Sequence, residues 1–283
     1  MPSLKNQLYI LVAMVAFAGN SVLCRLALAG SQIDPGTFTA IRLISGAFTL
    51  FILVNLTRSG RRFSLFSDDF NLKGSALLFG YAICFSYAYI DLATGTGALL
   101  LFGAVQLTII IVSLLAGIKL KAAAIAGVVI SFSGLVILLL PGATQPDLTG
   151  AILMVVSGIC WGGYTLNGKS SSNPLVSTQL NFIGASIPVF LLLPWLVEWD
   201  SASREGILYA LLSGSIASGL GYAIWYRVVK HISGLQAGVV QLSVPVIAAL
   251  GGVLFVSEPI TVWFLVSSLL VLGGIAITLV TKG

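Results

Sequence analysis

The chain of 283 residues is 58% hydrophobic and only 8% charged, with a mean hydropathy of +1.06. Soluble domains carry about 25% charged residues, so this composition excludes a water-soluble globular protein. The net charge of +5 could indicate nucleic-acid binding, but the positions of the basic residues indicate membrane topology instead. We therefore expect no nucleic-acid partner.

Ten apolar segments are long enough to cross a bilayer, whose hydrocarbon core of about 30 Å needs about 20 helical residues. We predict an all-α integral membrane protein with ten transmembrane helices, at 8–29, 36–56, 72–91, 95–117, 122–140, 149–168, 176–196, 206–228, 235–255 and 260–280. The first segment is longer than the ~7–15 apolar residues of a signal peptide, so we expect it to be retained.

Basic residues fall mostly on one side of this ten-helix topology. With the N-terminus inside, the outer side receives only Arg25 and Arg204. The inner side receives Lys5, Arg58, Arg61, Arg62, Lys73, Lys119, Lys121, Lys169, Arg227, Lys230 and Lys282. An excess of Lys and Arg in cytoplasmic loops is the positive-inside rule. We therefore expect both termini in the cytoplasm, with the chain in a bacterial-type inner membrane and the lipid bilayer around it.

The two halves of the chain resemble each other, which predicts repeats at residues 1–141 and 142–283. Five pairs of short matches follow the same order in both halves: Phe17–Asn20 with Cys160–Gly163, Asp34–Arg42 with Asn173–Asn181, Tyr87–Ala88 with Tyr222–Ala223, Gly103–Thr108 with Gly238–Ser243 and Gly134–Ile137 with Gly274–Ile277. Because each half has five spans, the second half enters the membrane from the opposite side. This predicts two inverted five-helix repeats, an architecture that gives alternating access to a site near the midplane.

These motifs resemble the EamA-type family of the drug/metabolite transporter superfamily, with two such modules covering essentially the whole chain. The resemblance rests on Pro35–Arg42, Trp161–Lys169, Gln241–Pro245 and Ser257–Pro259 leading to Gly273-Gly274. The first half departs from the family pattern at Ala18, Ile110 and Lys119. The resemblance implies solute export and a central cavity framed mainly by spans one, three, four, six, eight and nine.

Helical periodicity selects polar and aromatic residues on those spans as candidate substrate-binding residues. They are Asn20, Tyr81, Gln106, Trp161, Tyr164, Ser218, Tyr222 and Gln241. An apolar cavity edged by hydroxyls and amides suits a solute with a hydrophobic body and a polar end. For the aromatic residues the alternative is ordinary packing, and for the two glutamines it is a bond to a neighbouring backbone group. On span eight we expect Ser215, Ser218 and Tyr222 to share one face.

Arg42 is the charged residue that lies well inside a span, where a cation is energetically costly. It could bind a carboxylate or another anion. Alternatively, it could extend to the outer surface and cap neighbouring carbonyls. We expect the second role, because the resembling family places this span away from the central path.

No Asp, Glu or His lies in the middle of a span, which argues against a proton relay, an intramembrane enzyme and a cofactor or metal site. The chain is therefore predicted to export a small-molecule substrate that is neutral or zwitterionic. Amino acids are favoured, with bulky hydrophobic or aromatic ones preferred. The alternatives are a broad drug/metabolite exporter and a non-transporting scaffold subunit. The protein is expected to be a monomer or homodimer.

Overall fold

The computed structural model describes residues 4–57, 70–117, 119, 121–139, 146–168, 171, 173–198, 202–229, 231, 237 and 240–281. Its helices are α1 (Leu4–Leu28), α2 (Pro35–Leu56), α3 (Leu72–Ala88), α4 (Thr94–Leu115), α5 (Ala122–Leu139), α6 (Leu148–Gly168), α7 (Pro174–Leu191), α8 (Leu193–Leu196), α9 (Arg204–Leu212), η2 (Ser213–Leu220), α10 (Gly221–Val229), α12 (Ser243–Val256) and α13 (Val262–Thr281). Of the predicted topology and repeat residues, Arg58, Arg61, Arg62, Lys169, Lys230, Gly238 and Lys282 lie outside the described residues.

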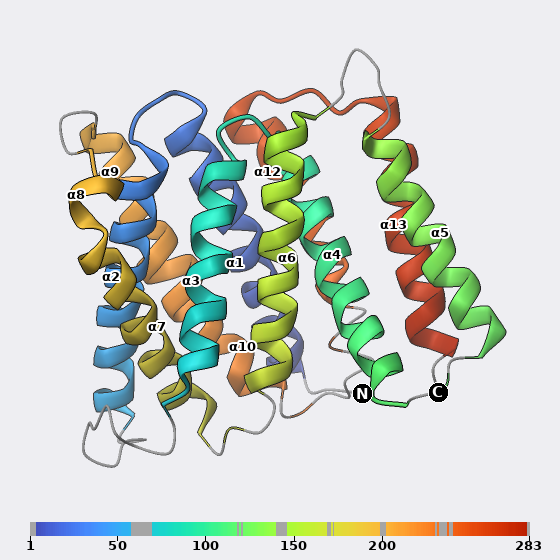
Figure 1. Ribbon diagram of the computed structural model, residues 1–283, viewed down its shortest axis with the longest axis horizontal. Helices are drawn as coiled ribbons and strands as arrows, with labels where there is room; N and C mark the ends of the chain where they lie inside the picture. Colours follow the sequence, from blue (N-terminus) through green and yellow to red (C-terminus); the bar gives the residue numbers. More distant parts are fainter. Residues whose placement is uncertain are drawn as a thin grey trace.

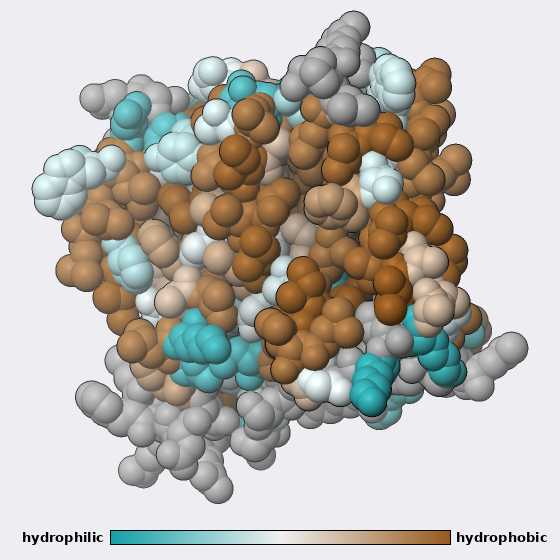
Figure 2. All heavy atoms as spheres, turned by 45° about the vertical axis from the view of Figure 1, so that its right-hand side comes forward, coloured by the Kyte–Doolittle hydropathy of each residue, from teal (hydrophilic) through white to brown (hydrophobic). Residues whose placement is uncertain are grey.

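Eight helical stretches in the described part of the chain are long and apolar enough to cross a membrane. Helices α3 and α12 are also apolar but shorter, at 17 and 14 residues. The outer surface is correspondingly apolar, and Figure 2 shows hydrophobic side chains across most of the visible face, with hydrophilic ones gathered towards its ends. The described residues form no strand. The predicted class, an all-α integral membrane protein, is confirmed at this level, and its division into inverted repeats stays a prediction.

Two helices with matching sequence starts, α2 and α7, also begin with matching local structure. The side chain of Asp34 accepts a hydrogen bond from the Thr37 amide at 2.8 Å, and Asn173 accepts one from the Val176 amide at 3.5 Å. In each case proline is the first helical residue. A capping Asp or Asn followed by proline is a strong start signal for a helix, because proline needs no amide partner there.

The helices around the centre of the bundle come from both halves of the chain (Figure 1). Helix α3 packs against α2, α6 and α7, while α4 packs against α6 and α12. Helix α1 lies against α12, η2 and α10. Between α3 and α4 the chain leaves the helix at residues 89–93, so the predicted third and fourth spans are separate helices. This packing brings α1, α3, α4, α6 and α10 around one central space.

Helices α5 and α13 form a separate pair at one end of the bundle (Figure 1). The Ser131 hydroxyl donates to the Val271 carbonyl at 3.2 Å, and the Thr278 hydroxyl donates to the Ala124 carbonyl at 3.1 Å. Residue numbers rise on one helix as they fall on the other, so the pair is antiparallel. A Cβ atom on Gly274 would lie 2.4 Å from the carbonyl oxygen of Gly127. Glycine is therefore needed at this crossing, as in other close helix pairs in membranes.

Candidate functional site

A small cavity lies among the central helices. Four of the eight predicted site residues line it, namely Asn20, Tyr81, Trp161 and Tyr222. The remaining wall is mostly apolar and consists of Phe17, Ser21, Phe85, Leu101, Phe102 and Ala217. The volume open to the centre of a water molecule is about 20 Å³, which is room for about one water. A solute of amino-acid size therefore enters this space only when the helices move apart.

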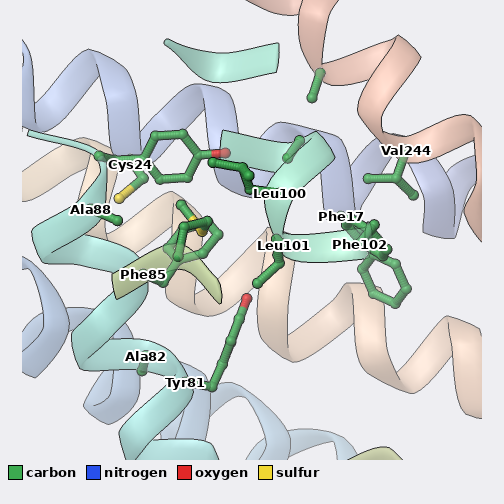
Figure 3. Packing of buried hydrophobic residues seen from close by; sticks show 14 of the residues in the cluster. Phe17, Cys24, Tyr81, Ala82, Phe85, Ala88, Leu100, Leu101, Phe102 and Val244 are labelled. Carbon is green, nitrogen blue, oxygen red and sulfur yellow. The ribbon is translucent and has the colours of Figure 1, made fainter. Parts of the chain in front are cut away.

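Aromatic side chains fill most of the space around the cavity. Trp161 on α6 lies at the centre of this group. The centre of its ring is 4.8 Å from the ring centre of Tyr81, 5.1 Å from that of Tyr222 and 5.4 Å from that of Tyr164. Figure 3 shows Tyr81 beside Leu101, with the tyrosine hydroxyl directed towards that leucine. Offset and tilted aromatic contacts of this kind each stabilise the packing by about 0.5–1.5 kcal/mol. The cluster is therefore a cohesive apolar wall that also carries hydroxyl groups.

A hydrogen-bond network crosses the same region and joins four helical elements. The Asn20 amide nitrogen donates to the Tyr81 hydroxyl at 3.2 Å, and the Asn20 carbonyl oxygen accepts from Ser213. Arg42 donates to the same Tyr81 hydroxyl at 2.8 Å and to the Ser218 hydroxyl at 3.4 Å. Tyr81 is thus the junction of the network, because two donors from different helices meet at its hydroxyl.

The π-helical segment η2 explains how two serines reach this network from the same element. Ser213 and Ser218 are five residues apart, and both are fully buried. In an α-helix five residues advance about 500°, which would place the side chains about 140° apart. In a π-helix, with its i→i+5 bonds, they lie on nearly the same side. π-helical turns often occur at functional sites.

The prediction that Ser215, Ser218 and Tyr222 share one face of span eight is therefore partly wrong. Ser218 and Tyr222 are buried, but Ser215 is half-exposed and donates to the carbonyl of Leu211 in its own helix. Ser213 takes the inward position in its place. Periodicity arguments assume 3.6 residues per turn, and a π-helical segment changes that spacing.

The expectation for Arg42 is also wrong. Its side chain is 2% exposed and does not extend to the outer surface. Its described bonds go to the hydroxyls of Tyr81 and Ser218 rather than to carbonyls. Its guanidinium carbon also lies 5.0 Å from the centre of the Tyr81 ring and 4.8 Å from that of Phe85. Packing of α2 against α3 and η2 places the side chain directly behind the cavity wall.

The other four predicted site residues do not line the cavity. Tyr164 is 2% exposed and stacks on Trp161, so it lies behind the aromatic wall. Among the described residues, Ser218 is connected to the network by its bond from Arg42. Gln106 is buried in α4 at 3% exposure. Gln241 donates to the carbonyl of Ala237 at 3.2 Å. This is the bond to a neighbouring backbone group that we gave as the alternative role for the glutamines.

An ion pair joins three segments at the end of the bundle that the predicted topology places outside. Arg25 donates from Nε to Glu258 at 3.0 Å, and from Nη1 to the carbonyls of Tyr89 and Ile90 at 3.1 and 2.6 Å. The second Glu258 oxygen accepts from the amide of Thr94, at the start of α4, at 2.7 Å. A carboxylate at a helix N-terminus is favourable because free amides and the helix dipole meet it there. The pair therefore connects α1, the α3–α4 turn and the α12–α13 turn.

The described residues contain no group of three or more His, Cys, Asp or Glu side chains that could hold a metal ion. The cavity wall itself presents the amide of Asn20, the hydroxyls of Ser21, Tyr81 and Tyr222, and aromatic faces, and the guanidinium of Arg42 lies behind it. Sequence reasoning did not select Ser213 or Phe17. For Phe17, its position one turn before Asn20 on the first span was an available signal, whereas nothing in the sequence indicated Ser213.

Comparison with known proteins defines the class to which this fold and cavity belong. Residues 148–280 match the model of the EamA-like transporter family. The chain is 46% identical over its full length to the uncharacterized protein PA1977 of Pseudomonas aeruginosa, covering 97% of that protein. It is 21% identical to an uncharacterized transporter of Archaeoglobus fulgidus and to the uncharacterized transporter YoaV of Bacillus subtilis, covering 97% and 87% of them.

A solved crystal structure of a protein that is 18% identical shares the fold, with a TM-score of 0.66 over 96% of this chain and 99% of that one. These findings identify a helical membrane protein of the transporter class. The match to the EamA-like family lies in the second half of the chain, and together with the relatives named as transporters it supports a membrane transporter of the EamA type.

Proposed function

We propose that this protein exports amino acids, preferably bulky hydrophobic or aromatic ones, across a bacterial inner membrane. The observation that carries the proposal is the central cavity, in which Tyr81, Trp161 and Tyr222 present aromatic faces and Asn20 presents an amide. Such a wall complements a solute with an apolar body and a polar end. The match to a transporter family supports movement of that solute rather than storage or scaffolding.

The same proposal includes ten spans arranged as two inverted repeats that rock around the cavity, with both termini in the cytoplasm. Reciprocal contacts between α5 and α13 support it. A Cβ atom on Gly134 would meet the amide nitrogen of Val271 at 2.9 Å, and one on its aligned partner Gly274 would meet the amide nitrogen of Ser131, which aligns with Val271, at 2.6 Å. Equivalent contacts in both directions are what a two-fold relation between the helices produces. Inverted repeats of this kind underlie alternating access in many transporters.

Transport down the solute gradient is the proposed driving mode. Of the described residues that line the cavity, none is Asp, Glu or His. Proton-coupled transport through a membrane protein normally uses such groups within the membrane. We therefore expect solute exchange that does not require a pH gradient.

The test is counterflow in proteoliposomes preloaded with unlabelled phenylalanine, following uptake of labelled phenylalanine with and without a pH gradient. We expect accelerated uptake that is indifferent to pH and is reduced at least about tenfold by Trp161→Ala, which removes the centre of the aromatic wall. The matched control is Trp195→Ala, since Trp195 is 81% exposed on α8 and does not line the cavity. No uptake of any amino acid would refute the substrate class, and uptake that requires a proton gradient would refute the driving mode.

A further inference from the structure

Arg42 has one hydrogen-bonding group that no described residue satisfies. Its Nη2 donates to Tyr81 and its Nε lies near Ser218, but Nη1 is buried without a partner. Buried polar groups almost always have partners, and an exception in a native structure needs an explanation. The guanidinium fork is therefore only partly occupied in this closed arrangement.

The charge of Arg42 is also unbalanced. The ion pair between Arg25 and Glu258 is the one that the described part of the chain contains, and no described carboxylate lies within ion-pair distance of Arg42. Aromatic faces on Tyr81 and Phe85 lie close to the guanidinium carbon, but they supply only a weak counter-charge. An unpaired cation inside the membrane is strongly unfavourable, and such residues usually pair or mark the path of a charged ligand.

The position of Arg42 connects it to the cavity. Tyr81 and Phe85, which lie against the guanidinium, both line the cavity, and the Tyr81 hydroxyl receives bonds from Arg42 and from the cavity residue Asn20. A small displacement of the Tyr81 ring would therefore open the guanidinium to the cavity. The hydroxyl that it now binds occupies the place of an incoming oxygen acceptor.

We propose that Arg42 binds the carboxylate of the transported solute, and this inference rests on the proposed function. The planar guanidinium offers two parallel donors that match the two oxygens of a carboxylate. A single cation balances one negative charge, so the site suits a monocarboxylate such as a zwitterionic amino acid better than a phosphate ester. The carboxylate takes Nη1 and displaces the Tyr81 hydroxyl from Nη2, while the aromatic cluster receives the side chain.

The second half of the chain offers a matched, uncharged counterpart. The repeat pattern aligns Arg42 with Asn181, which is 3% exposed and donates to the hydroxyl of Tyr164 at 3.5 Å. Its carbonyl oxygen is also buried without a partner. The two positions therefore share burial and a tyrosine partner and differ in charge, which makes Asn181→Ala a control for loss of a buried polar side chain.

The experiment compares ligands that share one aromatic body. Purified wild-type protein is assayed for counterflow of labelled phenylalanine in competition with 3-phenylpropionate, which keeps the carboxylate, and with phenylalaninamide, which lacks it. We expect the propionate to compete and the amide to compete at least about tenfold less well, because a hydrogen bond to a charged group is lost. Arg42→Gln should weaken the binding of phenylalanine about 10- to 100-fold and abolish the discrimination between carboxylate and amide. Arg42→Lys should restore part of it, and Asn181→Ala should keep the wild-type discrimination whatever its rate.

Several outcomes would overturn the inference while leaving the proposed function intact. These are counterflow in which the amide competes as well as phenylalanine, and an Arg42→Gln variant that keeps both affinity and discrimination. If Arg42→Gln does not fold, the wild-type competition alone decides between carboxylate and amide. If the wild type shows no amino-acid counterflow, the proposed substrate class fails. Thermal stabilisation by benzoate, lactate and octanoate then tests Arg42 separately. Stabilisation that Arg42→Gln removes supports carboxylate binding, and none with any carboxylate overturns it.

Discussion

Neutralising Glu258 should open the outer end of the transporter. The Glu258→Gln substitution keeps an oxygen acceptor for the Thr94 amide but removes the charge that pairs with Arg25. The two side chains are 18% and 14% exposed, so the pair lies between exposed ion pairs, which contribute about 0.2–1 kcal/mol, and buried charged hydrogen bonds, which contribute about 1.5–3 kcal/mol. We therefore expect the closed arrangement to lose about 1–2 kcal/mol relative to an outward-open one.

A loss of that size changes the ratio of the two arrangements by a factor of about 5–30. The assay uses Ser21→Cys, which places a thiol on the cavity wall, in a background from which Cys24, Cys84 and Cys160 have been removed. A membrane-impermeant thiol reagent is added from the outer side of oriented vesicles. The labelling rate should rise about 5- to 30-fold with Glu258→Gln.

The matched control for this substitution is Glu205→Gln. Glu205 is an exposed acid in the first turn of α9, on the side that the topology places outside. It should leave the labelling rate unchanged. Equal labelling in the wild type and Glu258→Gln, or an equal rise in both variants, would refute the reasoning that this ion pair holds the outer end closed.

Two further substitutions test packing and the π-helical segment by thermal unfolding in detergent. Gly127→Ala should destabilise by about 1–3 kcal/mol because the added methyl group would meet α13 at 2.5 Å, whereas Gly273→Ala meets nothing within 4 Å and should be neutral. Equal unfolding midpoints for these two would contradict the close crossing of α5 and α13. Ser213→Ala should cost about 1–3 kcal/mol because the Asn20 carbonyl loses its donor. Ser215→Ala should be nearly neutral. A larger loss of stability for Ser215→Ala than for Ser213→Ala would contradict the inward position of Ser213.

Hydropathy was sufficient to predict the helices long enough to span a membrane, because it depends on local composition. Each described helix that can span a membrane falls on a predicted segment. Relative placement of the helices does not depend on local composition. It needed the resemblance to a family, and the inverted repeat still awaits a direct test.

The candidate site was predictable only in part, for physical reasons that differ between residues. Asn20, Tyr81, Trp161 and Tyr222 line the cavity because aromatic and amide groups on adjoining faces pack inward together. Arg42 was misjudged because the resembling family places span two away from the central path, whereas tertiary packing here buries this side chain among hydroxyls and aromatic rings.

The arrangement around Tyr81 connects recognition of a solute with movement of the helices. One hydroxyl receives bonds from α1 and α2, and the ring of the same residue contacts Trp161 of α6. Separating these helices without a ligand would leave the donors of Asn20 and Arg42 unsatisfied inside the membrane, which is costly. A solute whose carboxylate occupies Arg42 satisfies one of those donors as the hydroxyl leaves. Such a solute stabilises the open arrangement more than the closed one, and a ligand shifts a conformational equilibrium only through a difference of this kind. A ligand without a carboxylate makes the same aromatic contacts but lacks that difference, so it should bind more weakly and should not promote exchange.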